Sequence, residues 1–188
     1  HQGWRAPLRE ALDWLRDTLA ATFIRDGGGL FADPHQARDD YIEVILDRRP
    51  EAIDQALNMG LIDEGAIELP DALAHADVVV LATPVRTILR QLAEIGPLLP
   101  VGSLLIDLGS TKREICAAMD ELPVGVQALG GHPMCGKEIA GIAAADAALY
   151  RGRTFILCPL ERTSSAALAL GQELARAVGA QPLVMDPD

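Results

Sequence analysis

Hydrophobic positions along the chain follow two repeats, one typical of amphipathic helices and the other of buried strands. Leu8, Leu12, Leu15 and Leu19 recur every three or four residues, which predicts a helix over residues 7–21. Further along, runs of apolar residues alternate with helical repeats of the same kind. They predict strands at 41–46, 76–81, 103–108, 126–129, 154–158 and 182–185, and helices at 50–59, 85–95, 111–119 and 164–178.

Strands that alternate with helices in this way predict an α/β fold of the Rossmann-like, doubly wound type, with a mostly parallel sheet and helices on both faces. Ligands of such sheets bind outside the carboxyl ends of the strands. The regular pattern covers residues 41–188, which we take as one Rossmann-like domain. Residues 1–40 are predicted to be an irregular N-terminal segment with a degenerate first strand–helix unit.

The composition indicates which side chains fill the core and which classes of binding partner are unfavourable. Hydrophobic residues make up 49% of the 188 residues but aromatic residues only 4%, so small aliphatic side chains must fill the core. Such a core suits parallel strands that are covered on both faces. The formal net charge of -11 argues against nucleic acid or an anionic membrane surface as the main partner.

The cysteines and the lack of long apolar runs indicate the compartment. Cys116, Cys135 and Cys158 are odd in number and show no paired spacing, so a disulfide framework is not expected. No apolar run reaches the ~18 residues that a membrane helix requires, and the first residues do not resemble a signal peptide. These features predict a cytoplasmic protein without a membrane partner.

Two strand ends suit a dinucleotide. Asp47 follows the strand at 41–46, where a carboxylate can accept hydrogen bonds from the ribose hydroxyls of NAD. Arg48 and Arg49 come next and could instead bind the 2′-phosphate of NADP. Thr83 and Pro84 end the strand at 76–81 and open a helix, whose first amides suit a pyrophosphate or a nicotinamide ribose. The alternatives are a helix cap at Asp47 and a structural stop at Thr83-Pro84.

Ser110 and Lys112 lie at the next strand end, at the N-terminus of a predicted helix that favours anions. A hydroxyl and an ammonium at this position fit a carboxylate-bearing substrate or the cofactor. Alternatively, Ser110 or Thr111 only caps the helix, because residues 111–114 have the Thr-x-x-Glu form of a capping box.

His132 is the strongest catalytic candidate because it stands at a strand end between Gly131 and Pro133. The pair Gly130-Gly131 allows close approach of a ligand to the backbone. Histidine titrates near neutral pH, so His132 can accept a proton from a substrate hydroxyl while a hydride leaves the same carbon. His132 and Cys135 could form half a metal site, but no second pair of suitable spacing exists, so no metal is expected.

The chain contains the runs LATPV at 81–85, IDLGSTK at 106–112 and GGHPM at 130–134. Their order and spacing resemble the prephenate dehydrogenase family of tyrosine biosynthesis, over about residues 41–188. The resemblance implies oxidative decarboxylation of prephenate to 4-hydroxyphenylpyruvate, with reduction of NAD or NADP. Members of the family that act on arogenate look very similar here, so arogenate is an alternative substrate.

The resemblance also implies roles for individual residues. His132 would withdraw the proton of the ring hydroxyl, and Ser110 would place that hydroxyl and the nicotinamide beside it. Glu138 would belong to the substrate-binding network, and Asp47 would hold the adenosine ribose. The family further has a helical C-terminal domain that dimerises, so a homodimer is expected only with that domain, which would begin where this chain stops.

The glycine turn of the family has an irregular counterpart here. Gly27, Gly29 and Ala32 fit the form Gly-x-Gly-x-x-Ala after a short predicted strand at 21–24, which makes Gly27 and Gly29 candidates for pyrophosphate binding. Arg25 and Asp26 interrupt that strand, and Pro34 interrupts the helix that should follow. A non-catalytic α/β module that has lost dinucleotide binding is therefore the alternative from another class.

Overall fold

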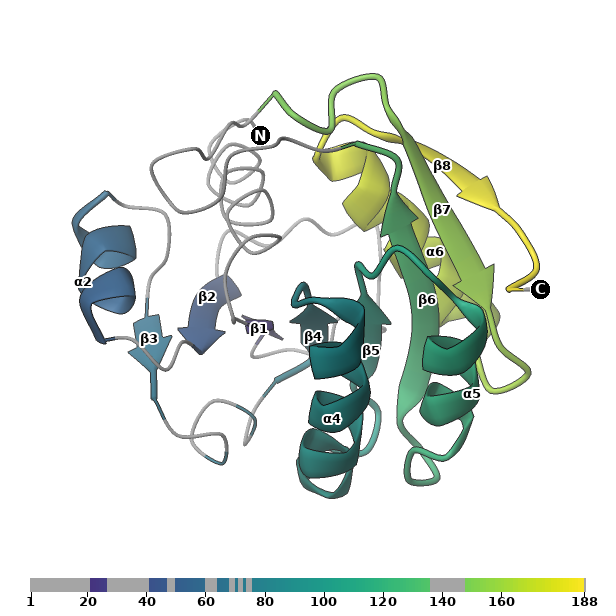
Figure 1. Cartoon of the computed structure of the whole chain (residues 1–188), viewed down its shortest axis with the longest axis horizontal. Coiled ribbons are helices and arrows are strands. Elements are labelled where there is room, and N and C mark those ends of the chain that lie inside the picture. The colour runs from purple at the N-terminus through teal and green to yellow at the C-terminus, as the bar shows by residue number, and fades with distance from the viewer. Residues whose placement is uncertain are drawn as a thin grey trace.

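The computed structural model describes residues 21–26, 41–46, 50–59, 64–67, 70, 73, 76–135 and 148–187. In these residues eight strands form one sheet, in the order β3-β2-β1-β4-β5-β6-β7-β8 (Figure 1). The strands are β1 (Ala21–Asp26), β2 (Tyr41–Leu46), β3 (Glu64–Ala66), β4 (Val78–Leu81), β5 (Leu104–Asp107), β6 (Gln127–Pro133), β7 (Thr154–Pro159) and β8 (Gln181–Val184). The helices are α2 (Pro50–Asn58), α4 (Val85–Ile95), α5 (Arg113–Asp120) and α6 (Ser165–Ala177), with a short 3-10 helix η1 (Gly96–Leu98).

The directions of the strands confirm a mostly parallel sheet with three exceptions. β2 pairs in parallel with β3, and β4, β5 and β6 pair in parallel with one another. β7 is antiparallel to β6, and β8 follows the direction of β7. β1 lies in the centre of the sheet and is antiparallel to both of its neighbours.

The residues that connect β1 to β2 are compatible with the antiparallel pairing of these two strands. A parallel pair needs a crossover connection, usually a helix, whereas an antiparallel pair can be joined at one edge of the sheet. The connecting residues 27–40 include three consecutive glycines and Pro34, which are poor helix formers. The register matches this reading, because Asp26 at the end of β1 pairs with Tyr41 at the start of β2.

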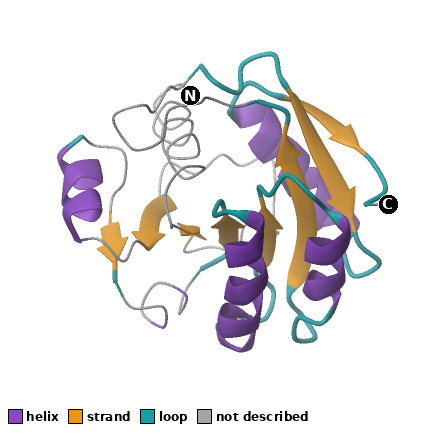
Figure 2. Ribbon diagram, in the orientation of Figure 1, coloured by secondary structure: helices purple, strands orange, loops and turns teal. Residues whose placement is uncertain are grey.

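The core has two layers, one on each face of the sheet. Val78 and Val80 of β4 contribute to the layer covered by α6, and Val79 and Leu81 contribute to the layer covered by α4 and α5. Figure 2 shows α4 and α5 on the near face and α6 behind the sheet. All four side chains are nearly inaccessible to solvent, as expected of strands that are covered on both faces.

The ends of α5 and α6 show which of the predicted helix caps are formed. Ser164 caps α6 by accepting a hydrogen bond from the amide of Ala167, and Gly179, in the left-handed region at φ 81°, follows the end of this helix. The capping box predicted at 111–114 is not formed, because Lys112 occupies the N-cap position of α5 and makes no side-chain cap there. No helix among the described residues is long and apolar enough to cross a membrane.

Candidate active site

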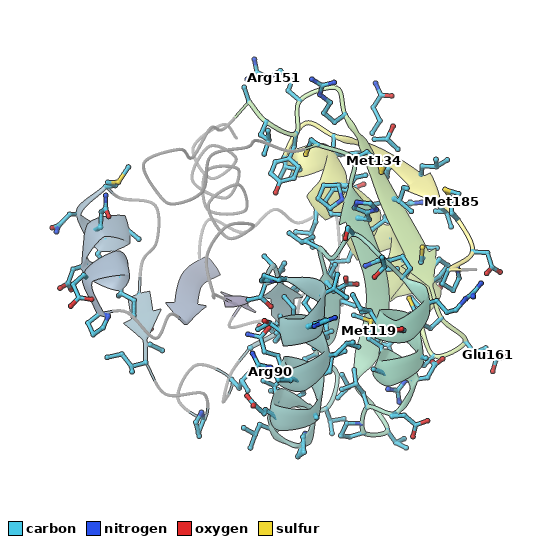
Figure 3. The ribbon with its side chains drawn as sticks, viewed as in Figure 1. Arg90, Met119, Met134, Arg151, Glu161 and Met185 are labelled. Carbon is cyan, nitrogen blue, oxygen red and sulfur yellow. The ribbon has the colours of Figure 1, made fainter. Side chains whose placement is uncertain are left out.

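The carboxyl ends of β4, β5 and β6 lie side by side and gather the predicted site residues. Leu81 pairs with Asp107 across β4 and β5, and Ile106 pairs with Leu129 across β5 and β6. Thr83, Ser110 and His132 follow or end these three strands, so the structure brings them to one edge of the sheet. In Figure 3, Met134 marks this edge next to the end of β6.

Asp107, the last residue of β5, is the buried centre of the edge. Its side chain has no solvent exposure, and its carboxylate accepts hydrogen bonds from the amides of Gly109 at 2.8 Å and Gly131 at 3.2 Å. It also forms an ion pair with the ammonium of Lys112. Burial raises the pKa of Asp107, and the charge of Lys112 opposes that rise. Each of these contacts points a donor at the carboxylate, as expected of a carboxylate that is paired with an ammonium.

Lys112 points into the protein instead of lying at an open helix N-terminus. The residue is 9% exposed, and besides the ion pair its ammonium donates a hydrogen bond to the carbonyl oxygen of Gly131 at 2.7 Å. An ammonium has three donors, and these contacts use two of them. Lys112 therefore binds Asp107 and Gly131 within the protein. Its contact with a substrate carboxylate stays a prediction.

Ser110 and Pro84 face solvent at the edge, whereas Thr83 does not. Ser110 and Pro84 are exposed, and Pro84 occupies the N-cap of α4. Thr83 is 4% exposed, and its hydroxyl donates a hydrogen bond to Oε1 of Gln91 at 2.6 Å. The Thr83 hydroxyl thus donates its proton within the protein, and only the backbone of this turn is available to a ligand. The hydroxyl of Ser110 is available because Ser110 is exposed.

His132 lies in β6, opposite Ile156 of β7, and is partly buried. Burial lowers the pKa of His132 below its ordinary value of 6.5, and the charge of Lys112 lowers it further. A lowered pKa keeps the imidazole neutral at physiological pH. A neutral imidazole at a strand end can accept a proton from a bound hydroxyl.

The glycine pair before His132 serves the packing of the protein itself, which corrects the expectation of a ligand approach. A Cβ atom on Gly130 would lie 2.8 Å from Sγ of Cys116 and 3.1 Å from Cβ of Cys158. A Cβ atom on Gly131 would collide with the backbone carbonyl oxygen of Asp107. Neighbouring strand and helix atoms fill these spaces, so both positions exclude a side chain.

Four predicted site residues lie outside the described residues: Asp47, Gly27, Gly29 and Glu138. The strand that precedes the two glycines is described, however, and its direction bears on them. Ala21 pairs with Leu81 and Ile24 with Val78, so β1 ends at the edge where β4 begins. In a Rossmann unit the glycine turn follows a strand that ends at the ligand edge. Here β1 ends at the opposite edge from Ser110 and His132.

Asp107 and its contacts were missed by sequence reasoning. The sequence does contain one signal, an acidic residue within the apolar run LLIDL. A carboxylate that is buried in such a strand requires a cation or hydrogen-bond donors as partners. Lys112 is the nearest cation along the chain, but its position at a strand end predicts a ligand-binding group. The contacts of both residues with Gly131 join positions far apart in the sequence, and no local pattern indicates them.

Known proteins share sequence similarity with this chain. A family model described as the nucleotide-binding domain of prephenate dehydrogenase matches residues 36–184, and a model of a domain of unknown function matches residues 1–64. The prephenate dehydrogenase of Bacillus subtilis (strain 168) is 34% identical over 180 residues, which cover 94% of this chain and 48% of that protein. The chain thus spans about half the length of this curated relative.

Solved structures show the same likeness. Prephenate dehydrogenase from A. aeolicus in complex with hydroxyphenyl propionate and NAD+ aligns with a TM-score of 0.66 at 28% identity, covering 76% of this chain and 50% of that one. The arogenate dehydrogenase of Synechocystis aligns with a TM-score of 0.70 at 27% identity, with the same two coverages.

Proposed function

Because the chain belongs to the prephenate dehydrogenase family through its nucleotide-binding domain, we propose that it forms the cofactor-binding half of an enzyme that oxidises and decarboxylates prephenate. The product is 4-hydroxyphenylpyruvate, and NAD or NADP is the oxidant. The observation that carries the proposal is that Ser110 and His132 follow or end adjacent parallel strands, β5 and β6, at one edge of the sheet. Burial lowers the pKa of His132 there, and Ser110 is exposed.

The proposed chemistry assigns one proton to His132. The imidazole takes the proton of the ring hydroxyl as the C–H bond at the same carbon breaks, so that a carbonyl group forms. When bound, the nicotinamide supplies the acceptor for the hydride. Loss of the ring carboxylate as carbon dioxide then leaves a phenolate, which takes the proton back from His132. Ser110 orients the ring hydroxyl toward the imidazole throughout.

The residues at the edge fit a dinucleotide. The first hydrogen bonds of α4 run from the amides of Thr87 and Ile88 to the carbonyl oxygen of Pro84. The amides of Val85 and Arg86, which come before them, suit a phosphate or ribose oxygen. Asp47 would hold the ribose hydroxyls of NAD, and Arg48 with Arg49 would hold the 2′-phosphate of NADP. Since β1 ends at the far edge, the turn at Thr83-Pro84 takes a larger share of this binding than Gly27 and Gly29.

Four further assignments belong to this proposal. Residues 41–188 are the nucleotide-binding domain, close to the family match at 36–184. Glu138 contributes to the substrate-binding network, and the enzyme is a homodimer through the part that its longer relatives possess. We place it in the cytoplasm, since Cys116, Cys135 and Cys158 form no disulfide, which suits a reducing compartment.

A product assay with two substrates tests the proposal. The complete enzyme is supplied with prephenate or arogenate, each with NAD or NADP, and reduced nicotinamide and the aromatic product are measured together. We expect prephenate to yield 4-hydroxyphenylpyruvate in equal amount to the reduced cofactor. Arogenate is the second candidate, because the arogenate dehydrogenase of Synechocystis shares the fold at a TM-score of 0.70. Failure of both substrates with both cofactors would exclude the proposal.

The pH profile of kcat/KM should show an acidic limb centred below 6.5, the ordinary pKa of histidine. His132 accepts a proton only when it is neutral, and its lowered pKa preserves the neutral form to lower pH. Activity is therefore retained at pH 6.5 and lost as the pH falls through the lowered pKa. A limb centred above 6.5 would contradict the environment described for His132.

A further inference from the structure

The two candidate catalytic side chains share one backbone feature. Ser110 directly follows Gly109, and His132 directly follows Gly131. The amides of both glycines donate hydrogen bonds to the carboxylate of Asp107, at 2.8 Å and 3.2 Å. One buried carboxylate therefore holds the residue before each catalytic candidate.

Lys112 binds Gly131 at its carbonyl group. Its ammonium bonds the carbonyl oxygen of Gly131 at 2.7 Å and pairs with the same carboxylate. The N–H and C=O groups of Gly131 are thus both engaged by the ion pair. Side-chain exposures of 7% for Lys112 and 0% for Asp107 protect these contacts from water.

Packing around Gly109 leaves no room for a side chain at the position before Ser110. A Cβ atom on Gly109 would lie 2.7 Å from Cδ1 of Ile115, 3.0 Å from the Asp107 carboxylate and 3.1 Å from Cδ1 of Ile88. The loop between β5 and α5 also lacks a side-chain cap at its helix end. The polar contact that holds this loop at Gly109 is thus the Asp107 carboxylate.

We propose that Asp107 and Lys112 are positioning residues that fix Ser110 and His132 relative to one another through the backbones of Gly109 and Gly131. The proposal rests on the proposed function, in which Ser110 and His132 act on one ring hydroxyl. In this role the pair acts through the backbones of the two glycines and takes no part in the transfer of the proton. Its contribution is the geometry in which the proton is transferred, where a displacement of about 1 Å can cost about 100-fold in rate.

The test uses the double variant Asp107→Asn/Lys112→Met, which keeps the shape of residue 107 and leaves no buried charge. An amide has one oxygen and one NH₂ group, so it accepts at one of the two positions and places donors against the amide at the other. At least one of the two glycines is then released. We expect kcat to fall by about 100-fold while KM for the cofactor changes by less than about threefold.

A matched control separates positioning from stability. Leu104→Ala removes a fully buried side chain from the same strand, on the face covered by α6, which the alternation of side chains along a strand places opposite to Asp107. It destabilises the fold, yet kcat per folded molecule should equal that of the parent. If the double variant folds and also keeps the parent kcat, the positioning role is overturned.

Amide hydrogen exchange gives a second readout that does not need turnover. In the double variant, exchange at Gly109 or Gly131 should accelerate at least about tenfold, while amides of Val79 and Leu105 in the sheet stay protected. Unchanged protection at both glycines would overturn the proposal. If the parent oxidises neither prephenate nor arogenate, the proposed function fails by itself. The exchange rates and the ring resonances of His132, expected to shift in the double variant, then decide whether the pair holds this strand end.

Discussion

Replacement of His132 by asparagine in the complete enzyme is expected to lower kcat for prephenate oxidation by about 100- to 10,000-fold, the usual contribution of a general base. Asparagine keeps a polar side chain of moderate size but cannot take a proton from the ring hydroxyl. His132 is partly buried at the end of β6 and its pKa is lowered, so the parent enzyme has the neutral base ready at physiological pH. Steady-state kinetics with prephenate under saturating cofactor measure the effect.

Cofactor binding supplies the control for this variant. The Kd for NAD or NADP, measured by calorimetry, should stay within about threefold of the parent value, because the proposed cofactor contacts lie at the turn after β4. The acidic limb of the pH profile should also disappear from the residual activity. A variant with the parent kcat would remove His132 from its assigned role.

Replacement of Lys112 by methionine should lower the free energy of unfolding by about 3–5 kcal/mol. The change removes the cationic partner of a carboxylate with no solvent exposure and also leaves the carbonyl oxygen of Gly131 without this donor. The expected loss of stability is large because a buried charge without a partner costs more free energy than the loss of a typical hydrogen bond. Urea denaturation followed by circular dichroism gives the measurement.

An exposed ion pair of the same chain is the matched control. Arg176 and Glu173 on α6 pair at 2.8 Å with side chains 51% and 55% exposed. Arg176→Met should change the free energy of unfolding by no more than about 1 kcal/mol, because water already solvates both charges. If Lys112→Met were as mild as Arg176→Met, the buried pair would not hold the strand ends as described.

The sequence predicted the part of the fold that depends on local patterns. Apolar runs of strand length placed β4 and β5 correctly, and the Ser164 and Gly179 signals marked the ends of α6. The rule that ligands bind at carboxyl strand ends then brought Thr83, Ser110 and His132 to one edge. These results need only periodicity, turn chemistry and strand direction.

Features set by contacts between distant residues were not predictable in this way. The reversed direction of β1 depends on its pairing with β2 and β4. The role of Gly131 depends on the backbone of Asp107, a residue on another strand. Lys112 was expected to face a ligand, but its burial with Asp107 turns it inward. Each outcome is a tertiary contact that overrides a local preference.

Binding of the cofactor at the edge formed by β4, β5 and β6 is the central claim, and backbone NMR of this chain during titration with NAD and NADP tests it most directly. We predict saturable shifts of the amides of Val85, Ser110 and His132 for at least one of the two cofactors. Amides near Val101 and Val124, at the opposite edge of the sheet, should not respond. No shift of either set at millimolar cofactor, or shifts confined to the opposite edge, would contradict the account.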